Sequence, residues 1–351
     1  MGGCMNFTHF SGAFDLFEGT RLIENGCAGF ADKNFCVKNN PDFSYGTASG
    51  TKGFTAVAVL RLVAENQLSL DDCVKRILLH SNEAARKYGQ LEWLSDSVTV
   101  RSLLNHSSGV PDYFDEELFD DFEASLCGNA NYHYDTPESF FPLTEAVWKK
   151  HKIPYASAGR FKYSNGGFVI LAAVVEAVSG MPFPDFVAQK VFADFGMNGS
   201  CFSRFDEMPP AGIVRATGYQ KNGRSNVYAV PVIGGGDGGA FTCVSDMAVF
   251  WNRLDPELHP GTAFASCIAE AWTPRMDGDD GLYGLGFWMR RENPRIVFLE
   301  GFDPGVQFFS FYNRDTKRSL TICLNDEQVN CGEVFESCYP MLAENSKSCD
   351  S

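Results

Sequence analysis

The stretch Ala48-Ser-Gly-Thr-Lys-Gly-Phe-Thr-Ala56 opens the segment that decides the fold. From Thr51 to Asn66 the sequence TKGFTAVAVLRLVAEN is apolar nearly all round a helical wheel, which is typical of a buried helix. A second such helix is predicted over about 167–178 (GFVILAAVVEAV), because Ser179-Gly180 and then Pro182 are stop signals. The sequence therefore predicts a core that contains two buried helices.

Strand-like runs, rich in β-branched or aromatic residues and bounded by Pro, Gly, Asn or Asp, lie at about 296–299, 306–312 and 319–324. The middle of the chain is mostly helical. This order predicts an α/β layer closed by both ends of the chain, with a helical subdomain inserted between them. We expect one domain overall, in which residues 1–48 and 210–351 form the α/β sheet region and residues 49–209 form the mainly helical region.

The composition excludes several classes of protein. With 351 residues, 44% of them hydrophobic and 21% charged, the chain has the profile of a packed protein of enzyme size. Its net charge of −15 repels the phosphate backbone of nucleic acid, so no nucleic-acid partner is expected. The longest strongly apolar stretch, 168–175, is shorter than the roughly 20 residues that cross a bilayer, so no membrane span is predicted.

The cysteines and histidines give no sign of a metal centre. Twelve cysteines are spread from Cys4 to Cys349 without a Cys-x-x-Cys pair, and the six histidines show no His-x-x-x-His spacing. We therefore predict no metal and no cofactor. Free thiols, together with an N-terminus (Met1–Phe10) that has no basic residue and no long apolar run, favour a cytoplasmic location. The oligomeric state is left open.

Ser49 and Lys52 are candidates for nucleophilic catalysis. They stand three residues apart, which places both side chains on one face of a helical turn. A serine hydroxyl is a weak nucleophile until a base takes its proton, and the pKa of a partly buried amine is lowered toward that task. The positive end of the helix dipole favours a developing oxyanion. The alternative is that Ser49 caps the helix and Lys52 is solvated, since Ser-x-x-Lys also occurs by chance.

Further segments match one family pattern in the same order. They are 60–63 (LRLV), 68–72 (LSLDD), 98–111 (VTVRSLLNHSSGVP), 161–168 (FKYSNGGF), 234–241, 245–248 (SDMA) and 283–288 (YGLGFW). With residues 48–56, this series resembles the family of class C β-lactamases, penicillin-binding proteins and serine esterases over roughly residues 20–325. The resemblance implies a β-lactamase/transpeptidase-like α/β fold, with an antiparallel sheet flanked by helices and an inserted helical subdomain.

The resemblance also implies roles for four residues. Ser49 would be the nucleophile that accepts the acyl group, and Lys52 and Tyr163 would share the transfer of its proton. Asn165 would orient the carbonyl or amide of the substrate. A tyrosine acts as a base only if a nearby cation stabilises its phenolate, and Lys52 would be that cation, so the choice of base stays open. Without Ser49, Tyr163 and Asn165 would be a loop tyrosine beside an N-cap asparagine.

The third motif of the family departs from its usual form. Leu299-Glu300-Gly301 stands where Lys-Thr-Gly or His-x-Gly is expected, and the register is fixed by Phe302-Asp-Pro-Gly305. The expected oxyanion hole survives, because its donors would be the backbone N–H groups of Ser49 and Phe302, which do not depend on side-chain identity. We expect Glu300, Gly301 and Phe302 to contact the substrate.

Loss of the cation in this motif suggests a charge preference. Glu300 adds a negative charge, and the run 112–123 (DYFDEELFDDFE) adds seven acids that the family layout would place at the rim of the cleft. The hypothesis is that anionic β-lactams and D-Ala-terminated peptides are poor substrates, and that neutral or cationic esters or amides are preferred. The alternative is a solvated acidic loop with Glu300 turned to solvent.

Two other features are expected to have structural roles. His106 is expected to be a structural hydrogen-bonding residue, and Gly234–Gly239 a turn that lets the backbone approach the cleft. The predicted function is that of a serine hydrolase acting through a Ser49 acyl-enzyme on an ester or amide of a small molecule or short peptide. The alternative, favoured by Leu299, is a non-catalytic ligand-binding or regulatory protein on the same fold.

Overall fold

A computed structural model gives the fold and describes residues 10–81, 86–114, 133–151 and 159–343. The main sheet has eight strands in the order β2-β1-β12-β11-β10-β9-β8-β7, and every neighbouring pair is antiparallel. These strands are β1 (Gly12–Glu18), β2 (Arg21–Ala28), β7 (Met276–Asp277), β8 (Leu282–Tyr283), β9 (Trp288–Met289), β10 (Ile296–Asp303), β11 (Val306–Asn313) and β12 (Arg318–Leu324). The predicted antiparallel sheet is confirmed.

The sheet joins segments from both ends of the chain. β1 pairs with β12 so that Gly12 lies opposite Leu324 and Glu18 opposite Arg318. The guanidinium of Arg318 donates a hydrogen bond of 3.1 Å to Glu18 Oε2 across this pair. The prediction that terminal segments close the α/β layer is therefore confirmed. β10 runs beyond the predicted range, because Gly301 still pairs with Phe308 of β11.

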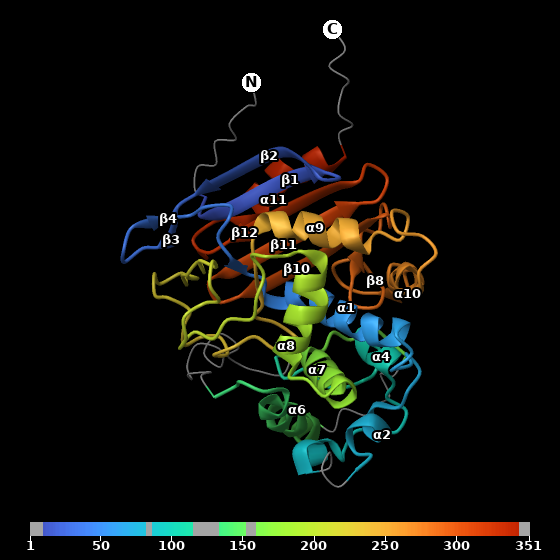
Figure 1. Ribbon diagram of the computed structural model, residues 1–351. Coiled ribbons are helices and arrows are strands. Elements are labelled where there is room, and N and C mark those ends of the chain that lie inside the picture. Colours follow the sequence, from blue (N-terminus) through green and yellow to red (C-terminus); the bar gives the residue numbers. More distant parts are fainter. Residues whose placement is uncertain (1–9, 82–85, 115–132, 152–158, 344–351) are drawn as a thin grey trace.

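Helix α1 (Thr51–Ala64) lies at the centre of the molecule (Figure 1). It packs against β10, α7 and α10, and its side chains are buried on every face over most of its length. Gly53 lets the sheet approach closely, since a Cβ there would lie 2.4 Å from Leu299 Cδ1. The prediction of a fully buried helix is confirmed, and its N-terminus is held directly against β10.

Helix α7 (Asn165–Ser179) is the second buried helix. Ser164 caps its N-terminus, because Ser164 Oγ accepts a hydrogen bond of 3.0 Å from the N–H of Gly167. Gly180 ends the helix with a φ of 71°, in the left-handed region that favours glycine. The helix predicted over 167–178 is confirmed, and it begins two residues earlier because Ser164 is the cap.

The other helices form two groups (Figure 1). On the far side of α1 from the sheet lie α2 (Val74–Leu78), α4 (Val100–Leu104) and α6 (Pro137–His151). The short η2 (Gly89–Leu91) packs on α6, and α8 (Phe183–Val187) and η5 (Ala188–Ala193) pack on α1. On the sheet lie α9 (Val244–Leu254), with α10 (Ala263–Ala271) beside α1, and on the opposite face α11 (Cys331–Cys338) and η6 (Tyr339–Leu342). The sheet is thus covered by helices on both faces.

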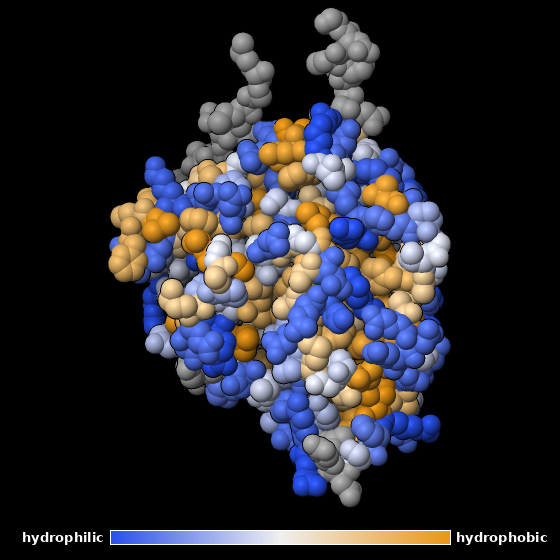
Figure 2. All heavy atoms as spheres, in the orientation of Figure 1, coloured by the Kyte–Doolittle hydropathy of each residue, from blue (hydrophilic) through white to orange (hydrophobic). Residues whose placement is uncertain are grey.

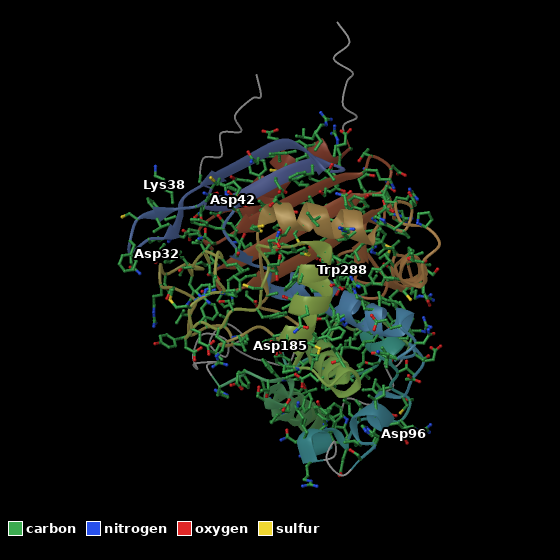
Figure 3. The ribbon with its side chains drawn as sticks, in the orientation of Figure 1. Asp32, Lys38, Asp42, Asp96, Asp185 and Trp288 are labelled. Carbon is green, nitrogen blue, oxygen red and sulfur yellow. The ribbon has the colours of Figure 1, made fainter. Side chains whose placement is uncertain are left out.

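Two short strand pairs lie outside the main sheet, namely β3 (Phe30–Asp32) with β4 (Val37–Lys38), and β5 (Tyr45–Gly46) with β6 (Phe241–Thr242). Exposed apolar side chains gather on the first pair, where Phe35 is 81% exposed (Figure 2). Figure 3 labels Asp32 and Lys38 on the same hairpin. The second pair leads into the turn that carries Ser49, so it is the pair that positions the site described below.

Two sequence expectations concern the chain as a whole. Within the described ranges no single helix has the length and apolar character to cross a membrane. α7 and the segment 183–193 together have that length and composition, but the two are bent by 76° relative to each other. The nine cysteines that fall in these ranges are all free thiols, as predicted.

Candidate active site

Ser49 lies in a tight turn, η1 (Ala48–Gly50), between β5 and α1. Ala48 has a φ of 44°, an unfavourable backbone conformation for a residue with a side chain. The N-cap residue of α1 is Gly50, and no side chain caps this helix. The interpretation of Ser49 as a helix cap is therefore wrong. Its hydroxyl lines a large cleft instead.

Lys52 is buried, with 2% of its surface exposed, so the interpretation of a solvated lysine is also wrong. Its Nζ donates hydrogen bonds to Ser49 Oγ at 2.9 Å, to Asn165 Oδ1 at 2.7 Å and to the backbone oxygen of Asp237 at 2.6 Å. Burial lowers the pKa of Lys52 to about 8, although nearby carboxylates oppose the shift. A neutral Lys52 amine would keep its N–H bonds to Asn165 Oδ1 and to the backbone oxygen of Asp237, and its lone pair would point at Ser49.

Tyr163 stands next to this pair. The ring centroid of Tyr163 is 4.9 Å from Lys52 Nζ, and the phenol hydrogen-bonds with the Ser49 side chain. Burial raises the pKa of Tyr163 well above its ordinary value, and the bond with Ser49 opposes this only in part. The phenol is therefore protonated near neutral pH. Electrostatics favours Lys52 over Tyr163 as the base, a choice that the sequence left open.

Asn165 links Lys52 to a carboxylate. Its Oδ1 accepts from Lys52, while its Nδ2 donates to Asp112 Oδ2 at 3.1 Å. Asp112 also accepts the backbone N–H of Asn165 at 3.2 Å, and burial raises the pKa of Asp112 to about 6. The sequence pointed to Asp112 only as the first acid of a run. In the structure it fixes the amide that holds Lys52.

The glycine-rich turn 234–239 brings Asp237 to the site. A Cβ on Gly236 would lie 2.3 Å from the backbone oxygen of Phe168, so the turn packs directly on α7. The carboxylate of Asp237 accepts a hydrogen bond from the hydroxyl of Tyr113, and its backbone oxygen accepts from Lys52. The sequence predicted the close approach of this backbone but not the role of Asp237. Its one signal was a single charged residue inside a glycine run.

Strand β10 runs against the nucleophile. A Cβ on Gly301 would lie 2.6 Å from the backbone nitrogen of Ser49, so no other residue fits without displacement. β9 pairs only with Val297 and Phe298 of β10, and among the described strands none continues that pairing toward Phe302. An unpaired edge presents backbone donors and acceptors. The predicted oxyanion donors therefore lie on facing segments, and their role remains a prediction.

Leu299 and Glu300, the first two residues of the third motif, point to opposite faces of the sheet. Leu299 packs on Gly53 of α1, and Glu300, the next residue along the strand, points to the opposite face of the sheet. Glu300 is half-buried and, unlike Phe302, is not among the described residues that line the cleft. Burial, and then Asp280, raise the pKa of Glu300 to about 7. Contacts of Glu300 and Gly301 with a substrate stay predictions.

The cleft has a volume of about 1780 Å³. Among the described residues that line it, seven are carboxylic acids, Asp112, Asp237, Asp277, Asp279, Asp280, Asp303 and Glu327, and two are lysines, Lys162 and Lys221. Burial, and then Asp237, raise the pKa of Asp303 to about 7. The acids at 115–123 that the sequence assigned to the rim lie outside the described residues. Among the described residues, the acids that line the cleft are Asp112 from the start of that run and six acids from other segments.

Comparisons with known proteins identify the family of this chain. A model of the Beta-lactamase family matches residues 8–332. Penicillin-binding protein PbpX of Bacillus subtilis (strain 168) is 24% identical over 341 residues, which cover 95% of this chain and 75% of that protein.

Two solved structures show the same fold. The penicillin binding protein from Bacillus halodurans superposes with a TM-score of 0.80 and 32% identity, over 95% of this chain and 97% of that one. The D-stereospecific amidohydrolase from Streptomyces sp. gives a TM-score of 0.70 at 21% identity, over 93% and 92% of the two chains. Because the family match spans nearly the whole chain, this protein belongs to the β-lactamase family of serine hydrolases.

Proposed function

We propose that this protein hydrolyses an ester or amide through an acyl-enzyme on Ser49. The observation that carries the proposal is the position of Lys52 Nζ, 2.9 Å from Ser49 Oγ and held by Asn165 and by the backbone of Asp237. The pKa of this buried amine, about 8, is close to the value that suits a general base near neutral pH.

In this mechanism the neutral amine of Lys52 takes the proton of Ser49 as Oγ bonds to the carbonyl carbon of the substrate. The oxyanion that forms is stabilised by the backbone N–H groups of Ser49 and Phe302. When the C–O or C–N bond breaks, the leaving group takes a proton from the Tyr163 phenol, which regains one from the Lys52 ammonium. Water then attacks the acyl ester with Lys52 again as base, which releases the acid and restores Ser49.

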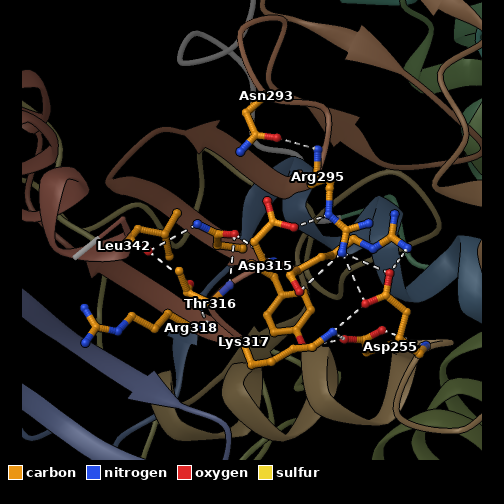
Figure 4. Close-up of polar contacts among 12 residues, drawn as sticks. Asp255, Asn293, Arg295, Asp315, Thr316, Lys317, Arg318 and Leu342 are labelled. Atoms are coloured by element: carbon orange, nitrogen blue, oxygen red, sulfur yellow. Dashed lines mark hydrogen bonds and ion pairs between the residues drawn. The ribbon is translucent and has the colours of Figure 1, made fainter. Parts of the chain in front are cut away.

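The charge of the cleft supports a substrate class. Of the residues that the structure describes, seven carboxylic acids and two lysines line it, and Leu299 replaces the cation of the usual third motif. No substitute is supplied by Arg295, which pairs with Glu257 at 3.0 Å and with Asp315 elsewhere in the molecule (Figure 4). We expect uncharged or cationic esters and amides, as small molecules or short peptides, to be better substrates than anionic β-lactams. The fold of a D-stereospecific amidohydrolase is consistent with amide chemistry.

A fluorophosphonate probe tests the proposal, because it forms a covalent bond only with an activated serine. The wild-type protein should gain the mass of one probe, as measured on the intact chain, and the Ser49→Ala variant should gain none. An adduct that persists in Ser49→Ala, or no adduct on a folded wild-type protein, would contradict it. The absence of an adduct on the folded wild-type protein would favour the alternative, a protein that binds a ligand without hydrolysing it, to which Leu299 points.

A further inference from the structure

His106 contacts three consecutive residues around Tyr163. Its backbone oxygen accepts the N–H of Lys162 at 2.8 Å, and its Nδ1 accepts the N–H of Ser164 at 3.1 Å. Between these two bonds the imidazole lies against the ring of Tyr163, with 4.4 Å between centroids. His106 therefore holds the chain before Tyr163 through its backbone oxygen and the chain after Tyr163 through its imidazole, which also packs on the Tyr163 ring.

The arrangement is unfavourable in two respects. His106 has a φ of 57°, in the left-handed region that few residues with side chains adopt. Because Nδ1 accepts a hydrogen bond, a neutral imidazole carries its proton on Nε2, and this buried nitrogen has no hydrogen-bond partner among the described residues. The imidazole ring lies among aromatic rings instead, with its centroid 4.9–5.6 Å from the centroids of Phe161, Phe168 and Tyr283. An apolar side chain would leave no unpaired donor here, so packing alone does not account for a histidine.

The contact with Ser164 also affects Asn165, the residue that holds Lys52. Ser164 caps α7, and its Oγ also donates to the backbone oxygen of Pro111 at 3.2 Å. The next residue is Asn165, whose Oδ1 accepts from Lys52. A shift of the Ser164 peptide would therefore move the phenol of Tyr163 and the amide of Asn165 together.

We infer that His106 is a positioning residue for the proton transfer, and that it acts by accepting the N–H of Ser164 through Nδ1. The inference rests on the proposed function, because it attributes the position of the Tyr163 phenol beside Ser49 to the contacts that His106 makes. His106 is not itself among the described residues that line the cleft, and it acts on Ser49 only through its neighbours, so its effect is on the geometry of other groups. A misplacement of about 1 Å in a catalytic group lowers a rate by about 100-fold.

Three variants separate this role from simple packing. His106→Asn keeps an acceptor near the place of Nδ1, and asparagine tolerates positive φ. His106→Gln carries the same amide one carbon further out, near the place of Nε2, and His106→Ala removes the side chain. The readouts are kcat and KM for an ester and the rate constant of Ser49 labelling by a fluorophosphonate, with thermal unfolding as the check on folding.

We expect His106→Ala and His106→Gln to lose about 100-fold in kcat and in labelling rate with KM changed less than about threefold, and His106→Asn to recover at least tenfold of that loss. Labelling of folded His106→Ala and His106→Gln at the wild-type rate would overturn the inference. So would equal losses in His106→Asn and His106→Gln, and this pair decides the question if His106→Ala does not fold. Absence of labelling in the wild-type protein would instead overturn the proposed function itself.

Discussion

Two groups of charged side chains in this molecule are built in opposite ways. At the end of α9 and the turn after β11, three acids face three bases: Asp255, Glu257 and Asp315 with Arg295, Arg314 and Lys317 (Figure 4). Lys317 Nζ lies 2.7 Å from both Asp255 and Glu257. The pKa of Glu257 is lowered to about 2, chiefly by the hydrogen bond from Lys317. Charges in this network are matched.

Around Lys52 the charges are not matched. Three carboxylic acids, Asp112, Asp237 and Asp303, surround one amine, and burial raises the pKa of each acid. The pKa of Asp303 reaches about 7, and that of Lys52 falls to about 8. Burial thus brings the pKa values of Asp303 and Lys52 close to neutral pH, instead of holding both groups fully charged.

The difference shows which charges serve the fold and which serve chemistry. Matched pairs connect α9 to the end of the sheet and need no further partner. Unmatched groups in a cleft are unfavourable for stability, and such perturbed pKa values cluster where a protein moves protons or binds a charged ligand. Variants that alter one group at a time, in the network or in the cleft, separate a loss of activity from a loss of stability.

Lys52→Met should have the largest effect. It removes the amine that takes the Ser49 proton but keeps an unbranched side chain of similar length. We expect kcat/KM for a neutral ester to fall by about 1000-fold or more, as the loss of a general base does. Steady-state kinetics on the folded variant provides the measurement. Activity within tenfold of wild type would show that another group is the base.

Lys317→Met is the matched variant in the balanced network. It leaves the buried carboxylate of Asp255 without its cation, so the free energy of unfolding should fall by about 1–3 kcal/mol. Because Lys317 is remote from the cleft lining, kcat/KM should stay within about twofold of wild type. Urea unfolding and the same ester assay measure the two quantities. A large loss of activity with unchanged stability would reverse the roles assigned to the two groups.

Substrate charge should have a smaller effect. Of two esters with the same alcohol and acyl groups of similar size, the one with an ammonium group should be favoured over the one with a carboxylate by about tenfold in kcat/KM, and salt should reduce this ratio. Asp303→Asn should narrow the ratio, whereas Asp315→Asn, which removes a carboxylate outside the cleft, should not. Efficient hydrolysis of the anionic β-lactam nitrocefin would contradict the preference.

The parts of the fold that the sequence predicts are those with local signals. α1 and α7 were predicted from their apolar residues and from Gly180, because burial on all sides and a left-handed C-cap leave a pattern within a few residues. Strands β7, β8 and β9 were not predicted. Each has two residues, and such strands form only through pairing with neighbours in the sheet, which no short window contains.

The candidate site divides in the same way. Ser49, Lys52, Tyr163 and Asn165 were predicted because their motifs are short and ordered along the chain, and the structure brings these four together. The roles of Asp112, Asp237 and Asp303 were missed, since these acids come from three distant segments and meet only in the folded chain. The charge of Glu300 is evident from the sequence, but the alternation of β10 decides which face of the sheet it occupies.

The central claim is that a buried amine of lowered pKa activates Ser49, and the pH dependence of Ser49 labelling tests it most directly. The labelling rate with an uncharged fluorophosphonate, followed by intact mass, should rise with pH and level off above a midpoint near pH 8, where Lys52 loses its proton. Asp303 raises the pKa of Lys52, so Asp303→Asn should move the midpoint to lower pH. A rate that does not change between pH 6 and 9, or a midpoint unmoved in Asp303→Asn, would contradict the claim.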